Sequence, residues 1–215
     1  MSANSELDQL FLDRLNKAIN QVATLFKKHP LDFLYESDIQ VALYSALYEN
    51  FEYLRFNPNA QRLKDFKLPI GQSDGRINPV KTEYPSGKRF DIAILDPNDS
   101  DINKKIWAQP CKVGIEIKFW QVDGTGGQVK GDVQKLLDYQ QMREKQNRPF
   151  LGISLLFLQP GTPEKRLKGY EPLANNTDFP SNGLSVQIIG INNDGLWRRN
   201  ASEWLAQQTI RDKTD

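Results

Sequence analysis

Hydrophobic residues recur every three to four positions in two N-terminal stretches of the chain, a spacing typical of amphipathic helices. The first stretch covers about residues 6–28 and ends before Pro30, because the position preceding a proline is disfavoured in helical conformation. The second covers about residues 37–53, where Ser37 and Gln40 fit the two polar positions of a capping box. The pattern therefore predicts two helices before any strand.

Further along the chain the apolar residues alternate or form short runs, which indicates strands. Five segments carry this pattern: Val80–Tyr84, Arg89–Leu95, Val113–Trp120, about 150–158 and Val186–Ile191. We expect helices over about 131–145 and 200–210, and a long loop over 159–184. The first two strands form a hairpin, and a helix between the third and fourth gives a parallel crossover. The order predicts a layered α/β domain with a mixed β-sheet.

The length of 215 residues, with 39% hydrophobic and 26% charged positions, fits one globular domain over 1–215. We divide it into an N-terminal helical extension (1–30), a core (35–158), and a final part with a loop, the last strand and a C-terminal helix (159–215). The N-terminus has no pattern of a secretory leader, and no apolar run approaches the roughly 18 residues that a membrane span needs. We therefore expect a cytoplasmic protein with no membrane partner.

Composition restricts the available chemistry. The single cysteine, Cys111, and the single histidine, His29, exclude a disulfide framework, zinc sites built from several such residues, and histidine-based nucleases. A serine hydrolase would depend on His29, which precedes Pro30 in an expected loop. The net charge of +1 argues against strong non-specific nucleic-acid binding, whose affinity comes largely from phosphate neutralisation. Carboxylates and lysines remain as the catalytic groups.

Two charged residues interrupt the apolar strand Val113–Trp120. Because side chains alternate between the faces of a strand, Glu116 and Lys118 share one face with Gly114. Charges on an interior strand are costly unless they are paired or bind a metal. The alternative is a solvated face on which Glu116 and Lys118 form a surface ion pair.

The preceding strand contains a second acidic residue, Asp91, although aspartate is disfavoured in strands. Oxygens of Asp91 and Glu116 on neighbouring strands can hold Mg²⁺, which prefers hard oxygen ligands. Lys118 beside such a metal can orient a water or neutralise charge on a phosphate. The alternative is that Asp91 is only a residue of the strand entry.

Asp91 followed by Glu116-x-Lys118 on an apolar strand resembles the PD-(D/E)XK nuclease superfamily, over about residues 35–158, with Phe90 where the motif has proline. The resemblance implies the restriction-endonuclease-like fold, a three-layer core in which helices flank a mixed β-sheet. It implies a DNA endonuclease that hydrolyses phosphodiester bonds with Mg²⁺ or Mn²⁺. Asp91 and Glu116 would bind the metal, and Lys118 would position the attacking water and stabilise the transition state.

Further residues fit the resemblance. Glu36 would be an additional catalytic carboxylate and metal ligand, or simply a residue favoured at a helix start. Lys135 and Tyr139 resemble a degenerate Gln-x-x-x-Tyr pattern of some nuclease subfamilies and would contact substrate, or lie on an exposed polar flank. Lys88 and Arg89 would contact phosphates, or belong to a solvated face.

Two other functions stay open. One is a catalytically decayed nucleic-acid-binding or interaction module on the same fold. The other is a structural or regulatory α/β protein in which Glu116 and Lys118 pair at the surface. If the chain is a nuclease, the resemblance implies a homodimer, and the loops over 57–78 and 159–184 would set specificity.

Overall fold

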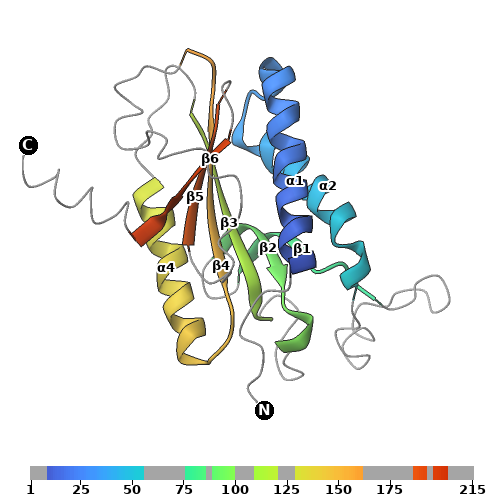
Figure 1. The fold of residues 1–215 in the computed structure, drawn as a ribbon, viewed down its shortest axis with the longest axis vertical. Helices are drawn as coiled ribbons and strands as arrows, with labels where there is room; N and C mark the ends of the chain where they lie inside the picture. The colour runs from blue at the N-terminus through green and yellow to red at the C-terminus, as the bar shows by residue number, and fades with distance from the viewer. Residues whose placement is uncertain are drawn as a thin grey trace, which may run out of the picture.

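The computed structural model describes residues 9–55, 76–85, 89–99, 109–120, 129–161, 186–192 and 196–202. Within these ranges three α-helices pack on one six-stranded sheet (Figure 1). The helices are α1 (Gln9–Lys28), α2 (Glu36–Asn50) and α4 (Val129–Lys145). The strands are β1 (Val80–Pro85), β2 (Arg89–Leu95), β3 (Cys111–Trp120), β4 (Leu151–Leu158), β5 (Val186–Ile191) and β6 (Leu196–Asn200). None of the helices in these ranges combines the length and the apolar character needed to cross a membrane.

The strands lie in the sheet in their sequence order, β1 to β6. The pairs β1–β2, β2–β3 and β5–β6 are antiparallel, whereas β3–β4 and β4–β5 are parallel. Helix α4 is the connection between β3 and β4, as a parallel crossover requires. The predicted α/β class, the hairpin and the mixed sheet are confirmed.

Helices cover both faces of the sheet. Helices α1 and α2 lie together on one face and α4 lies on the other (Figure 1). Ile115 and Ile117 of β3 join the core of α1 and α2, whereas Phe90 of β2 packs with Leu136 and Tyr139 of α4. Every residue of β4 is buried, as expected for a strand with both faces covered. The predicted alternation of β3 is confirmed.

Helix α2 begins one residue earlier than predicted. Its first residue is Glu36, and the carboxylate of Asp38 accepts the backbone N–H groups of Leu34 and Tyr35, each at 2.8 Å. Asp38 is therefore the capping side chain, and the predicted capping by Ser37 and Gln40 is wrong. Gln40 instead reaches across to the sheet, as described below.

The strand β6 was not predicted. Its two consecutive arginines break the alternation that identifies a strand from sequence, yet Arg198 is buried and donates to Asn16 Oδ1 of α1 at 2.7 Å. The helix expected over 200–210 begins with the helical residues 201–202, and its remainder lies outside the described residues. Most of the expected loops over 57–78 and 159–184 also lies outside them.

Helix α4 approaches β4 closely at Gly152. A Cβ atom there would lie 2.9 Å from Val186 Cγ2 and 3.1 Å from Leu136 Cβ, closer than side chains pack. We expect Gly152→Ala to lower the free energy of unfolding by about 1–3 kcal/mol, because Val186 of β5 and Leu136 of α4 must shift. The matched change Gly131→Ala, with open space around the new methyl group, should instead raise it by up to about 1 kcal/mol. Urea unfolding of both variants measures the two changes in the free energy of unfolding. Equal changes would contradict the close packing around Gly152.

Candidate active site

Strands β2 and β3 stop pairing where the candidate site begins. Their ladder runs only as far as Ile92 opposite Ile115. Asp91 comes immediately before Ile92 in β2, and its backbone carbonyl accepts a hydrogen bond from Gln40 Nε2 of α2 at 2.8 Å. The carboxylate of Asp91 accepts the backbone N–H of Ile117 at 2.7 Å. Asp91 is thus held beside β3 by its side chain, in the place where a backbone pair would otherwise be.

Glu116 is the most buried carboxylate of the site, with 2% of the residue exposed. Its Oε1 lies 2.7 Å from the Nζ of Lys135 on α4. Burial raises the pKa of Glu116 to about 8, and the charges of Asp91 and Asp132 act in the same direction, against the opposing effect of Lys135. The site therefore favours either a proton or a cation on Glu116.

Lys118 lies between two carboxylates. Its Nζ is 3.3 Å from Glu36 Oε1 and 3.2 Å from Asp132 Oδ2, and it donates to the Ile117 carbonyl at 3.0 Å. Burial alone would lower the pKa of Lys118, but the charges of Asp132 and Glu36 outweigh it, so that the pKa is raised. Lys118 is therefore a protonated ammonium group at neutral pH.

These contacts form an alternating chain of charges across three elements, which we call the charge network. Asp132 joins its two halves, because its other oxygen lies 4.0 Å from Lys135 Nζ. Asp91 stands beside the chain and raises the pKa of both Glu36 and Glu116 by its charge. Fully ionised, the network has four carboxylates against two ammonium groups, an excess of two negative charges. Its members are Glu36, Asp91, Glu116, Lys118, Asp132 and Lys135.

The structure brings together the four residues predicted to be catalytic, and Lys135 with them. Glu36 contributes from the start of α2 with its side chain 44% exposed, so it lies at the rim of the network. Glu116 is buried and pairs with Lys135, whereas Lys118 pairs with Glu36 and Asp132. The alternative of a solvated surface pair between Glu116 and Lys118 is therefore wrong.

Asp132 was not predicted as a site residue. It lies in the first turn of α4, three residues before Lys135. Acidic residues are common in that position, because they interact favourably with the helix dipole, so the type of residue alone does not distinguish it. Its role follows only from the packing of α4 against β3, which brings it to Lys118.

Tyr139 does not face the network, which corrects its prediction as a substrate-binding residue. It is 2% exposed, and its hydroxyl accepts the backbone N–H of Cys111 at 3.3 Å. Its ring packs against Phe90 and Phe150, with centroids 5.1 and 4.7 Å away. The apolar stripe of α4 is wide enough to include position 139, so Tyr139 is a core residue.

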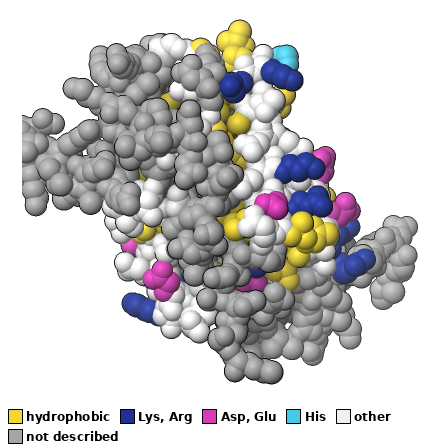
Figure 2. All heavy atoms as spheres, in the orientation of Figure 1, with side chains coloured by type: hydrophobic (Ala, Val, Ile, Leu, Met, Phe, Trp, Pro, Cys, Tyr) yellow, Lys and Arg dark blue, Asp and Glu magenta, His cyan; other side chains and the backbone are white. Residues whose placement is uncertain are grey.

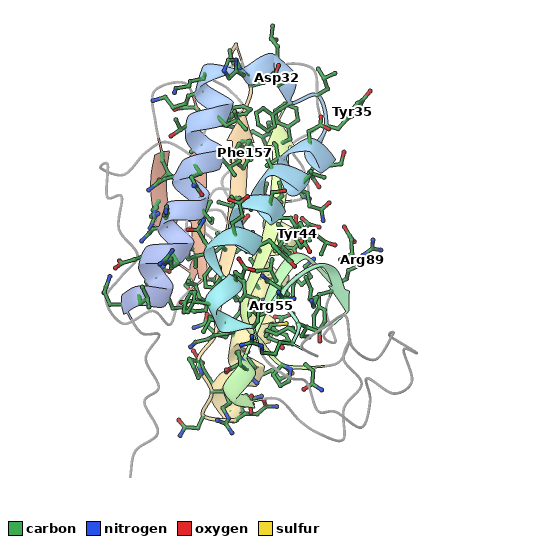
Figure 3. All side chains as sticks on the ribbon, turned by 90° about the vertical axis from the view of Figure 1, so that its right-hand side faces the viewer. Asp32, Tyr35, Tyr44, Arg55, Arg89 and Phe157 are labelled. Carbon is green, nitrogen blue, oxygen red and sulfur yellow. The ribbon has the colours of Figure 1, made fainter. Side chains whose placement is uncertain are left out.

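The basic pair of the hairpin is only partly described. Arg89 projects outward at the end of the hairpin (Figure 3) and forms an ion pair with Glu83 of β1. Lys88 lies outside the described residues. On the face drawn in Figure 2, basic and acidic side chains lie next to one another, in keeping with the near-zero net charge.

Asp91 and Glu116 have carboxylate oxygens, the type of donor that a hard divalent cation prefers. Asp91 Oδ1 accepts no hydrogen bond from any described residue, and the buried Glu116 requires a compensating positive charge. The two negative charges in excess equal the charge of one such cation. Among the described residues, however, no three His, Cys, Asp or Glu side chains are grouped closely enough to hold a metal. Lysine ammonium groups lie against Glu116 and Glu36 instead.

The burial of Glu116 gives a testable pH dependence in the metal-free protein. Between pH of about 4.5 and about 8 the folded state holds a proton on Glu116 that the unfolded state has lost, and the pKa values of Asp91 and Glu36 are raised in the same sense. The free energy of unfolding in EDTA should therefore fall as pH rises through this window, by at most roughly 1.4 kcal/mol per unit for each such proton.

The Glu116→Gln variant should have a visibly smaller slope in urea unfolding across this pH range. The Glu49→Gln variant, changed at an exposed glutamate of α2, should keep the slope of the wild type. A free energy of unfolding that is constant or rises between pH 5 and 8 in the wild type would show that Glu116 is ionised without cost.

Comparisons of the chain with protein-family models, with curated proteins and with solved structures give no match. The fold and the site define an α/β protein in which a charged network of lysines and carboxylates lies where two central strands part.

Proposed function

We propose that the chain is a metal-dependent nuclease, a hydrolase of phosphodiester bonds with DNA as its expected substrate. The observation that carries this proposal is the convergence of Asp91, Glu116 and Lys118 at the point where β2 and β3 part. A buried carboxylate, a second carboxylate with one oxygen that accepts no hydrogen bond from the described residues, and a charged lysine are groups that metal-assisted phosphate hydrolysis can use.

The order of elements supports a restriction-endonuclease-like variant of the α/β class. Helix α2 precedes the hairpin β1–β2, and β3, α4 and β4 follow as a parallel unit, all within about residues 35–158. The two acidic positions lie on the adjacent strands β2 and β3, as the resemblance implies. On this proposal residues 1–215 form a single nuclease-like domain.

Asp91 and Glu116 would hold Mg²⁺ or Mn²⁺, with Glu36 as an additional carboxylate. When bound, the cation supplies charge neutralisation at the phosphate and acidifies a bound water. Lys118 is a protonated ammonium and therefore acts through its charge: it orients the attacking water and stabilises the negative charge of the transition state. Asp132 and Glu36 keep that ammonium in place.

A nucleic-acid-binding or interaction module without catalysis is the second candidate. The pairing of Glu116 and Glu36 with lysines favours it, since both carboxylates already have counter-charges. Calorimetry distinguishes the two: DNA binding without any Mg²⁺ or Mn²⁺ binding would support the module.

The proposed activity is tested on single-stranded, double-stranded and branched DNA and on RNA, each with Mg²⁺ or with EDTA. We expect cleavage of at least one DNA substrate in Mg²⁺ and none in EDTA. Intact substrates under all metal conditions would refute the nuclease and leave the binding module.

A further inference from the structure

Among the described residues, Lys135 provides the positive charge closest to Glu116. Its Nζ lies 2.7 Å from Glu116 Oε1 and donates to the backbone carbonyl of Arg89 at 2.7 Å. The ammonium also lies 5.9 Å from the centroid of the Phe90 ring, within the range of a cation–π contact. The Lys135 ammonium thus occupies a position beside Glu116 that a bound cation could take.

A buried charge left alone is strongly destabilising, and a nearby opposite charge offsets part of that cost. Lys135 therefore lowers the cost of ionising Glu116 without a metal, although burial still raises the pKa of Glu116 to about 8. The pairing also has a cost for cation binding, because a metal ion at Glu116 would meet the repulsion of the Lys135 ammonium, which lies 2.7 Å from Oε1. Lys135 and a metal ion therefore compete for Glu116.

Lys135 has a route away from Glu116. Its side chain is 24% exposed, whereas Glu116 is nearly inaccessible, so the lysine can move toward solvent while the carboxylate stays. A lysine stem is long and flexible, and its ammonium is a strongly hydrated point charge that solvent accepts readily.

We propose that Lys135 occupies the cation position beside Glu116 in the metal-free protein, leaves it when a divalent cation binds, and then contacts a phosphate of the nucleic acid. This inference rests on the proposed nuclease function and adds to it a coupling between metal binding and nucleic-acid binding. Because coupling between two ligands is reciprocal, the metal should strengthen nucleic-acid binding and nucleic acid should strengthen metal binding.

The first test is calorimetric titration of Mn²⁺ into the protein without nucleic acid. Lys135→Gln removes the competitor and should bind Mn²⁺ at least about fivefold more tightly than the wild type. Lys135→Arg keeps the charge and should stay close to the wild-type affinity. Lys145→Gln, at an exposed position in the last turn of the same helix, controls for the loss of one charge and should leave the affinity unchanged.

The second readout is the fluorescence anisotropy of a short DNA duplex, with Ca²⁺ as an oxygen-seeking cation or with EDTA. Ca²⁺ should tighten DNA binding by the wild type, and Lys135→Gln should lose most of that gain although it binds metal better. If Lys135 were purely structural, its replacement would not strengthen metal binding and at the same time weaken the effect of metal on DNA binding. Circular dichroism verifies that the variants are folded.

Two failures are distinguishable. If the wild type binds Mn²⁺ and cleaves DNA, but Lys135→Gln binds Mn²⁺ equally or more weakly, the competition is refuted and the nuclease function stands. If the wild type neither binds Mn²⁺ nor cleaves DNA, the proposed function and the coupling are both refuted.

Discussion

Lys118→Met should lower the rate of Mg²⁺-dependent DNA cleavage about a thousandfold, because methionine keeps the length of the side chain and removes its charge. The ammonium of Lys118 lies 3.3 Å from Glu36 Oε1 and 3.2 Å from Asp132 Oδ2. Its loss leaves the network more negative, so metal binding should persist. The expected result is a fall in kcat with little change in the Mg²⁺ concentration that the reaction requires.

Single-turnover cleavage at saturating Mg²⁺ measures this effect. Lys112→Met is the matched control, since Lys112 lies on the same strand but stacks over the ring of Phe11, 4.8 Å from its centroid, away from the network. Lys112→Met should cleave at the wild-type rate. A Lys118→Met enzyme that keeps a tenth of the wild-type rate or more would remove Lys118 from the mechanism.

The second large effect concerns stability. Arg143→Met should lower the free energy of unfolding by about 3–5 kcal/mol, because it removes one partner of a buried ion pair. Arg143 is 1% exposed, and its guanidinium lies 2.7 Å from Asp99 and 3.8 Å from Asp96, both just beyond β2. It ties the last turns of α4 to the end of β2, and α4 carries Asp132 and Lys135.

Arg148 provides the control for this prediction, because it contacts the other oxygen of the same Asp99 at 3.2 Å with its side chain 44% exposed. Exposed pairs contribute little, so Arg148→Met should change the free energy of unfolding by at most about 1 kcal/mol. Urea unfolding compares the two variants. Equal losses, or a loss below about 1 kcal/mol for Arg143→Met, would contradict the role of burial.

The elements with a regular pattern could be predicted from the sequence. The alternation of Val113–Trp120 predicts which side chains of β3 face α1 and α2, because the period of a strand is fixed by its geometry. The unbroken apolar run of β4 predicts burial on both faces. The strand β6 could not be predicted in this way, because Arg198 is buried through a contact with α1 that is distant in sequence.

The same distinction holds for the candidate site. Asp91, Glu116 and Lys118 are identified by their residue types on neighbouring strands. The pairing of Lys135 with Glu116 depends on how α4 packs on the sheet, and no local pattern specifies that packing. Tyr139 shows the reverse error: a motif-like spacing suggested a substrate contact, whereas the helix turns that residue into the core.

The central claim, a metal-dependent nuclease built on Asp91 and Glu116, is tested most directly by plasmid cleavage. The wild type and an Asp91→Asn/Glu116→Gln double variant, purified identically and both folded by circular dichroism, are incubated with plasmid in Mg²⁺ and in EDTA. Cleavage by the wild type in Mg²⁺, with none in EDTA and none by the double variant, is the predicted result. Equal cleavage by both proteins, or wild-type cleavage that persists in EDTA, would contradict it.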